Sequence, residues 1–172
     1  SKAIKVNKGV DINLSGVAEQ KISAAQNSSV VALVPDDFVG TIPKLTVKVG
    51  DEVKAGTSLF YDKKRENIVF TSPVSGEVVE IKRGDKRKIM EVKILADNER
   101  RYEEFKSWVS GSREELTAQL LEMGLWPFVK QRPFGTIADP NDKPKSIFIS
   151  TFDSAPLAAD ISFLMKDSLV DF

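Results

Sequence analysis

A chain of 172 residues that contains neither cysteine nor histidine cannot build a thiolate cluster, a zinc site of the usual kind, or a Ser-His-Asp triad. Lysine plus arginine and aspartate plus glutamate both number 25, so the whole chain has no net field that would attract nucleic acid or anionic lipid. No apolar run approaches the length of a membrane span, and residues 1–10 lack the apolar core of a secretory signal. We therefore expect a cytoplasmic location and no membrane span.

Residues 1–97 are predicted to form an all-β domain. Short apolar segments at 30–34, 44–49, 58–62, 67–71, 76–82 and 89–95 alternate with glycine, proline and aspartate. These intervening residue types are the ones that turns select for backbone reasons.

An internal repeat supports this prediction. The segment "VKVGDEVKA" at 47–55 recurs 34 residues later as "IKRGDKRKI" at 81–89. The repeat predicts a barrel or sandwich with quasi-two-fold symmetry, in which Gly50 and Gly84 occupy equivalent turns that tolerate positive φ. Substitution of either glycine is then expected to cost a similar amount of stability.

Residues 98–172 are predicted to form a helical connector and the start of an α/β domain that this chain leaves incomplete. Tyr102, Phe105 and Trp108 recur at helical spacing, and Ser112 with Glu115 forms a capping box for a helix that ends at Gly124. A strand is expected at 146–151, followed by a helix from Leu157 onward. The predicted fold class is thus α+β, and the strand is expected to expose apolar side chains because this chain offers it no partner.

The segment "GDEVKAGTSLFYDKKRENIVFTSPVSGEV" at 50–78 resembles the barrel-sandwich hybrid of biotinyl and lipoyl carrier domains, in which a modified lysine sits at a hairpin tip. Here the tip contains Lys63, Lys64 and Arg65, and the carrier lysine would fall at about Arg65. The tip lacks both the Met-Lys-Met of biotinylation and the Asp-Lys-Ala of lipoylation. We therefore expect no covalently bound cofactor, with a carrier domain as the alternative.

Four longer motifs, at 7–16, 36–64, 71–88 and 132–160, resemble the N-terminal part of the A subunits of the bacterial Na+-translocating NADH:quinone oxidoreductase. The first two motifs distinguish this family from the C subunits of the related ferredoxin:NAD oxidoreductase complex, which share the barrel type. The resemblance implies a peripheral subunit at the cytoplasmic face of the inner membrane, within a six-subunit complex that pumps Na+ as electrons pass from NADH to ubiquinone. It also implies a second domain similar to the flavin-binding domain of a complex I flavoprotein subunit.

A flavin phosphate needs a glycine-rich loop whose amides cradle it, and glycines 111, 124 and 135 are too scattered to form one. The resemblance therefore implies a relative without flavin, whose partners are the other subunits and whose ligand in the full-length subunit is ubiquinone. No residue is expected to be catalytic or to bind a metal ion.

Candidate contact residues for a quinone or a partner are Trp126, Phe128 and Phe134, whose rings could stack on a quinone, and Asp153 and Ser154, which follow the predicted strand. The alternatives are core packing for the aromatic residues and a turn for the polar ones. The basic run at 82–88 could dock an acidic partner or form a solvated hairpin rim. A binding module for nucleic acid or anionic lipid is the third hypothesis, and neither the zero net charge nor the lack of aromatic residues within the basic run favours it.

Overall fold

Two antiparallel sheets form between residues 30 and 96, where the sequence predicts an all-β domain. The computed structural model describes residues 9, 15–16, 19–24, 26, 28–106, 111–150, 155, 157–158 and 160–165. One sheet has the order β1-β7-β6-β3 and the other the order β2-β4-β5. The bounds are β1 (Val30–Leu33), β2 (Pro43–Leu45), β3 (Glu52–Val53), β4 (Ser58–Asp62), β5 (Arg65–Thr71), β6 (Gly76–Arg83) and β7 (Ile89–Ala96).

Alternation of apolar and polar side chains directs one face of each sheet into a shared core. Phe60 of β4 lies opposite Phe70 of β5 in the strand register, and their rings stack at a centroid distance of 4.7 Å. Val53, Val78, Ile89, Val92 and Ile94 supply buried apolar side chains of the other sheet. Aromatic and β-branched side chains at these positions stabilise paired strands by burying apolar surface.

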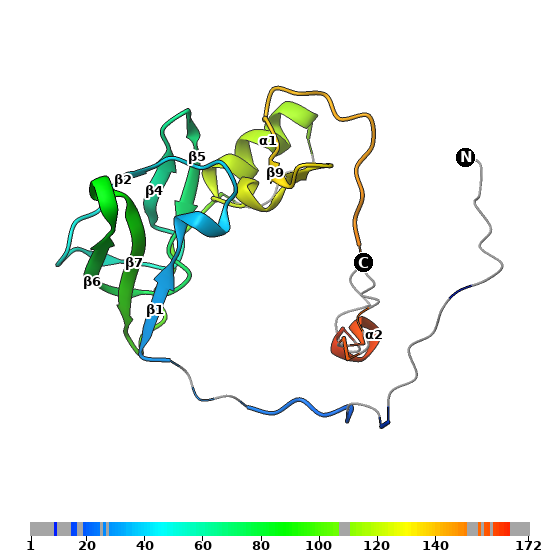
Figure 1. Ribbon diagram of the computed structural model, residues 1–172, viewed down its shortest axis with the longest axis horizontal. Helices are drawn as coiled ribbons and strands as arrows, with labels where there is room; N and C mark the ends of the chain where they lie inside the picture. Colours follow the sequence, from blue (N-terminus) through cyan, green and yellow to red (C-terminus); the bar gives the residue numbers. More distant parts are fainter. Residues whose placement is uncertain are drawn as a thin grey trace. The chain divides into compact units, whose positions relative to one another are not determined.

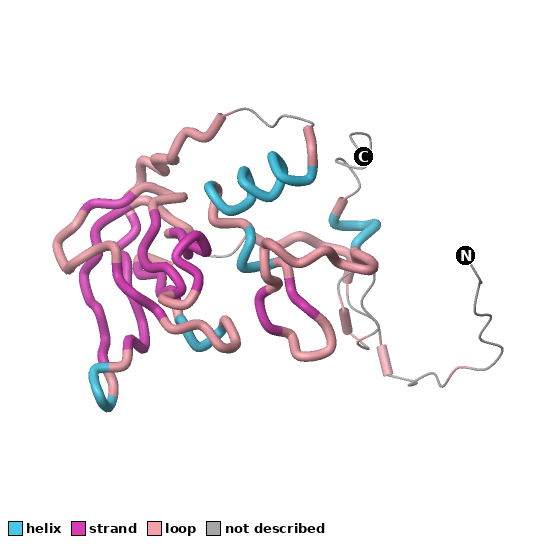
Figure 2. Tube along the Cα trace, turned by 90° about the horizontal axis from the view of Figure 1, so that it is seen from above, coloured by secondary structure: helices cyan, strands magenta, loops and turns pink. Residues whose placement is uncertain are grey.

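The chain after the barrel returns to the same core. Helix α1 (Arg113–Glu122) is followed by the 3-10 turn η3 (Trp126–Phe128) and by the hairpin of β8 (Lys130–Gln131) and β9 (Thr136–Ile137). Trp126 and Ile137 are buried with the barrel residues. Figure 1 shows α1 beside β5, and Figure 2 shows α1, η3 and the β8–β9 hairpin together on one side of the strands.

The predicted capping box is confirmed at the start of α1. The Ser112 side chain accepts a hydrogen bond from the Glu115 backbone N–H, and the Glu115 carboxylate accepts one from the Ser112 backbone N–H. Gly124 follows the helix with φ of +69°, the left-handed conformation that ends helices and favours glycine. Both ends of this helix could therefore be recognised in the sequence.

Residues 26–143 form one compact unit, and residues 1–25 with 144–172 form another. In the second unit, α2 (Ile161–Leu164) is capped by Asp160, whose side chain accepts hydrogen bonds from the backbone N–H groups of Ser162 and Phe163. None of the described helices has the length and apolar character needed to cross a bilayer. The division into domains at residues 97 and 98 stays a prediction.

Several predicted elements differ from the structure. The strand predicted at 44–49 is shortened to β2, because the backbone N–H of Lys48 donates to the carboxylate of Asp51 within a turn. The helix predicted from Tyr102 does not form over residues 101–106, where the chain runs beside Ala55 through hydrogen bonds from Ala55 N to Arg101 O and from Glu103 N to Ala55 O. Residues 107–110 lie outside the described residues.

The strand predicted at 146–151 is absent over 146–150, because no strand among the described residues pairs with it. The expected exposure is confirmed, since Ile147, Phe148 and Ile149 are exposed. Of the described residues in the helix predicted from Leu157 onward, Ile161–Leu164 (α2) are helical and 157–158 are not.

The two repeated glycines adopt different conformations. Gly50 has φ of +92°, as predicted. Gly84 has φ of −98°, so it needs no left-handed conformation. The left-handed residues of the β6–β7 turn are instead Lys86 and Arg87 of η2 (Asp85–Arg87), and the predicted equivalence of the two turns is wrong.

Candidate functional site

The three predicted aromatic residues occupy different environments. Trp126 is only 8% exposed, and its indole N–H donates to the backbone carbonyl of Ala138 at 2.8 Å. This ring packs in the core, where its polar atom already has a partner. Phe134 is 78% exposed in the turn of the β8–β9 hairpin, and Phe128, at the end of η3, is 68% exposed.

Phe128 is the outer member of a chain of aromatic rings that leads into the core. Its ring centroid lies 6.2 Å from that of Phe38, and Phe38 meets Phe70 edge-on at 4.7 Å. The ammonium group of Lys130 lies 5.0 Å from the centre of the Phe38 ring, a cation–π geometry. The sequence did not indicate that Phe38 and Lys130 are neighbours, because they lie far apart in the chain and their contact depends on the tertiary fold.

Asp153 and Ser154, the two polar candidates, lie outside the described residues. Asp160 in the same stretch serves as the N-cap of α2. None of the described residues forms a group of three or more acidic side chains that could hold a metal ion.

The hairpin tip that resembles a carrier site is fixed by a partly buried ion pair between Asp62 and Arg65. Asp62 is fully buried, and its carboxylate accepts hydrogen bonds from the backbone N–H groups of Ile42 and Lys64 and from Nε of Arg65, the last at 3.2 Å. The Arg65 guanidinium also donates to the backbone carbonyl of Ile137 at 3.1 Å. The residue at the position of the carrier lysine thus holds the tip against the β8–β9 hairpin, while Lys63 and Lys64 are exposed.

A groove of about 530 Å3 lies between the β4–β5 pair, residues 103–105 and the end of α1. Its carboxylates are Glu103, Glu104 and Glu122, and it also exposes Phe105. Glu103 already accepts a hydrogen bond from the Thr57 hydroxyl at 2.7 Å and pairs with Lys54 at 3.8 Å. The groove does not include Trp126, Phe128 or Phe134.

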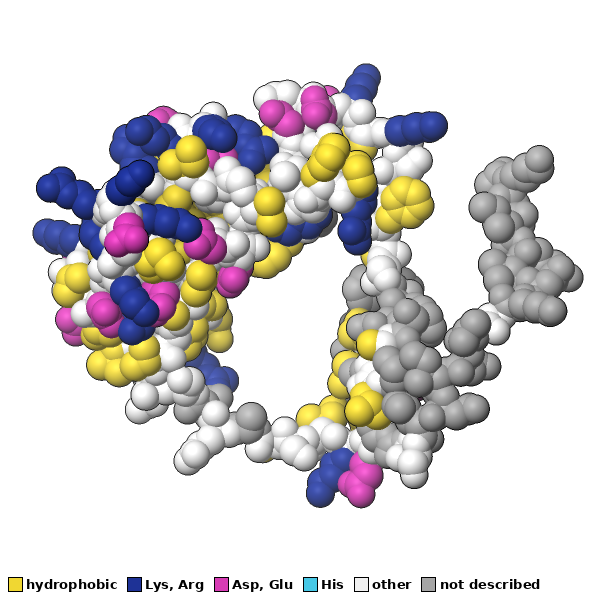
Figure 3. Space-filling view, viewed as in Figure 1, with side chains coloured by type: hydrophobic (Ala, Val, Ile, Leu, Met, Phe, Trp, Pro, Cys, Tyr) yellow, Lys and Arg dark blue, Asp and Glu magenta, His cyan; other side chains and the backbone are white. Residues whose placement is uncertain are grey.

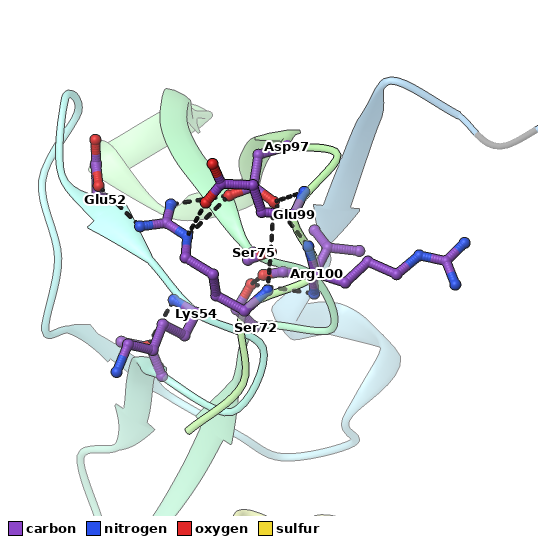
Figure 4. A network of polar contacts seen from close by, with 10 residues as sticks. Glu52, Lys54, Ser72, Ser75, Asp97, Glu99 and Arg100 are labelled. Carbon is purple, nitrogen blue, oxygen red and sulfur yellow. Dashed lines mark hydrogen bonds and ion pairs between the residues drawn. The ribbon is translucent and has the colours of Figure 1, made fainter. Parts of the chain in front are cut away.

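A network of polar contacts fastens the chain that leaves β7 (Figure 4). The carboxylate of Asp97 accepts from the Ser75 hydroxyl at 2.6 Å and from the Arg101 guanidinium at 2.8 Å. Arg101 also pairs with Glu52 at 3.2 Å. The Ser75 hydroxyl, and then Arg101, lower the pKa of Asp97, and the Asp97 carboxylate raises the pKa of Arg101.

Part of the basic run at 82–88 is paired with acidic residues. Lys82 contacts Glu91 at 3.0 Å, and Lys88 contacts Asp36 of the 3-10 turn η1 (Pro35–Asp37) at 2.6 Å. The hydrogen bond from Lys82 lowers the pKa of Glu91. Lys86 and Arg87 remain exposed at the tip, and Figure 3 shows Lys and Arg side chains gathered on this side of the molecule, at the left of the view.

Two family models match the chain in succession. The NqrA N-terminal barrel-sandwich hybrid domain matches residues 4–97, and the NqrA second alpha/beta domain matches residues 111–172. The fold class predicted from the sequence is therefore confirmed.

Curated relatives match this chain over part of a longer sequence. The A subunit of the Na(+)-translocating NADH-quinone reductase of Pseudomonas aeruginosa (strain UCBPP-PA14) is 40% identical over 162 residues, which are 91% of this chain and 36% of that protein. The corresponding subunits of Rhodopirellula baltica (strain SH1) and Vibrio vulnificus (strain YJ016) are 37% and 36% identical, over 95% and 98% of this chain and 37% and 39% of their own length. The chain thus spans little more than a third of the relatives that it matches.

Proposed function

Because this chain belongs to the NqrA family, the A subunits of the Na(+)-translocating NADH-quinone reductase, we propose that it is part of a non-catalytic subunit of such a complex. The observation that carries the proposal is the succession of the two family models over residues 4–97 and 111–172. In this proposal the subunit lies at the cytoplasmic face of a bacterial inner membrane. It contacts the other subunits of a six-subunit complex and contributes to assembly and to the reduction of ubiquinone.

The proposed subunit carries neither biotin nor lipoate, although its barrel is of the carrier type. A carrier lysine must be exposed, so that a modifying enzyme can reach it and the loaded arm can swing. Arg65 occupies this position, and its guanidinium is engaged by Asp62 and by the Ile137 carbonyl. This geometry supports a barrel that acts as a fixed platform, in which the hairpin tip is held in place and carries no swinging arm.

Phe128 is the aromatic candidate that the geometry favours for contact with a quinone. Its ring is exposed and rests edge-on against Phe38, so one face can stack on a planar ring without disturbing the core. Trp126, two residues earlier in η3, holds this turn in place because its indole N–H donates a hydrogen bond to the Ala138 carbonyl. Phe134 remains a second candidate for contact, while Asp153 and Ser154 remain candidates from the sequence alone.

Co-purification tests membership of the complex. The full-length subunit should be expressed beside the other five subunits, with an affinity tag on one membrane subunit. We expect it to elute with the tagged subunit in equal amounts and to be required for quinone reduction. Elution without it, or full quinone reduction in its absence, would show that the proposed function is wrong.

A photoreactive short-chain ubiquinone tests the contact residue. In the assembled complex it should label peptides around Phe128, and a Phe128→Ala variant should lose this labelling while the complex remains assembled. Labelling confined to other subunits would remove Phe128 from the quinone site and would leave membership of the complex untouched.

A further inference from the structure

We propose that one face of this chain docks on the surface of an anionic phospholipid bilayer. This docking face consists of Val39, Ile42, Lys63, Lys64, Phe128 and Lys130. This proposal rests on the proposed function, which places the subunit beside a membrane.

Contacts between three segments make the docking face continuous. The backbone N–H of Lys63 donates to the carbonyl of Ile42 at 2.8 Å, which joins the β4–β5 tip to the loop at 38–42. At the other end of this loop, Phe38 contacts the ring of Phe128 at 6.2 Å and the ammonium group of Lys130 at 5.0 Å. The hydrogen bond from Arg65 to the Ile137 carbonyl joins the β4–β5 tip to the β8–β9 hairpin. In that hairpin Ile137 lies opposite Lys130 in the strand register.

Large apolar side chains of the docking face point into solvent. Val39 is 54%, Ile42 is 45% and Phe128 is 68% exposed. Isolated apolar residues on a surface need no explanation, but a group that is joined by contacts and bordered by cations is typical of an interaction site. Insertion of such side chains at the headgroup boundary would remove their apolar surface from water.

The charges that border these apolar side chains are positive. Lys63, Lys64 and Lys130 are exposed, and no described carboxylate forms an ion pair with them. Of the two acidic residues that precede Phe38, Asp36 pairs with Lys88, so the opposing charges near this face are Asp37 and, beside the β4–β5 tip, Glu66. The whole chain has zero net charge, but this face has a local excess of cations. Figure 3 shows dark-blue side chains beside yellow ones over the β4–β5 tip, at the upper left of the view.

Charge complementarity favours lipid over the membrane subunits as the occupant. Cytoplasmic loops of membrane proteins carry an excess of lysine and arginine, which would repel the docking face. Anionic headgroups instead attract basic side chains that lie near the membrane surface. A docking face that lies at the headgroup boundary would also place Phe128 where a lipid-soluble quinone reaches the protein.

The β6–β7 tip provides a matched comparison within the same chain. Lys86 and Arg87 are exposed there, but no large apolar side chain is exposed between residues 84 and 90. The two tips therefore each expose two cations, but only the β4–β5 tip lies beside exposed apolar side chains. A bilayer that recognises only positive charge would treat them alike.

Vesicle flotation with the 172-residue chain tests the proposal. The vesicles contain phosphatidylcholine, with or without about a third of phosphatidylglycerol, and no quinone. We expect binding to the anionic vesicles only, and at least a tenfold loss of affinity (~1.4 kcal/mol) in Lys63→Glu/Lys64→Glu. Phe128→Ser should also weaken binding, while the charge-matched variant Lys86→Glu/Arg87→Glu should change it less than about threefold. Thermal unfolding would show that each variant remains folded.

Absence of binding to anionic vesicles, or equal losses in the two double variants, would overturn the proposal. If the Lys63→Glu/Lys64→Glu variant binds vesicles normally but fails to assemble with purified subunits, the docking face is a protein interface and the lipid proposal is wrong. Neither result bears on co-purification of the unmodified subunit, so failure here is distinguishable from failure of the proposed function.

Discussion

Asp62 illustrates how one buried carboxylate determines what the hairpin tip can do. Its charge is removed from water, and such a burial is tolerated only when partners satisfy it. The partners are two backbone N–H groups and Arg65. The position where related barrels carry a lysine is therefore committed to the stability of the tip.

Removal of the Arg65 guanidinium should leave this carboxylate without its cation. We expect Arg65→Met to lower the free energy of unfolding by about 2 to 3 kcal/mol, because breaking a buried pair leaves an uncompensated charge. Lys64→Ala, at the exposed neighbouring position, should change it by less than about 0.5 kcal/mol. Urea unfolding of the two variants measures the difference, and equal effects would show that the ion pair does not hold the tip.

The glycines of the barrel should differ in their sensitivity to substitution. At Gly76, with φ of +151°, an added Cβ would overlap the backbone carbonyl of Leu95, so Gly76→Ala should be severely destabilising. Gly50, with φ of +92°, has open space around an added Cβ, and its alanine variant should cost about 1 kcal/mol through backbone strain alone. Gly84→Ala should cost less than Gly50→Ala, because its φ is negative and an added Cβ meets only the flexible side chain of Met90 at 3.1 Å. Melting temperatures in any other order would contradict these conformations.

The connector after β7 is held to the barrel by a cluster whose contribution depends on pH. Ser75 and Arg101 stabilise the charged form of Asp97, which lowers the pKa of this carboxyl below its ordinary value of 3.8. A lowered pKa contributes stability that is fully present above the ordinary value and is lost as the pH falls through the lower, folded value. The loss should therefore be confined to acid conditions.

Asp97→Asn should abolish this part of the acid sensitivity. We expect the wild type to exceed the variant in free energy of unfolding at about pH 6, and the gap to narrow as the pH is lowered below about 4. Denaturant unfolding at a series of pH values measures the gap. A gap that stays constant down to about pH 2 would indicate that the hydrogen bonds of Asp97, and not its charge, fasten the connector.

Local patterns predicted the elements whose partners lie close in the sequence. The antiparallel strands around Phe60 and Phe70, the capping box of Ser112 and the end of α1 at Gly124 were all recognisable, because each depends on neighbouring residues. The helical spacing of Tyr102 and Phe105 failed as a signal, since hydrogen bonds to Ala55 hold that stretch extended. No pattern in the sequence could reveal that Arg65 reaches Ile137 or that Phe128 rests on Phe38, because these contacts depend on the tertiary fold.

Taken as a unit, residues 26–143 combine the barrel with a segment that shares its core. Trp126 and Ile137 enter the same buried cluster as Phe60 and Ile94, so the segment after the connector packs against the barrel, and the Ile137 carbonyl holds Arg65 of the carrier-type hairpin. A hairpin held in this way keeps a constant position relative to the rest of the barrel.

The chain by itself should therefore be free of any tightly bound redox group. It has no cysteine for an iron–sulfur cluster and no histidine for haem, and its scattered glycines form no cradle for a flavin phosphate. Purified from a host that makes flavins and biotin, the chain should show no visible absorbance, and its intact mass should equal that of the unmodified sequence.

The chain should also fail to oxidise NADH, with or without added quinone, while a complex assembled without the full-length subunit should lose quinone reduction. Stoichiometric release of flavin on denaturation, or an added mass on Lys63 or Lys64, would instead assign this barrel a carrier or catalytic role, because either group would have to be held by residues that we interpret as a fixed platform.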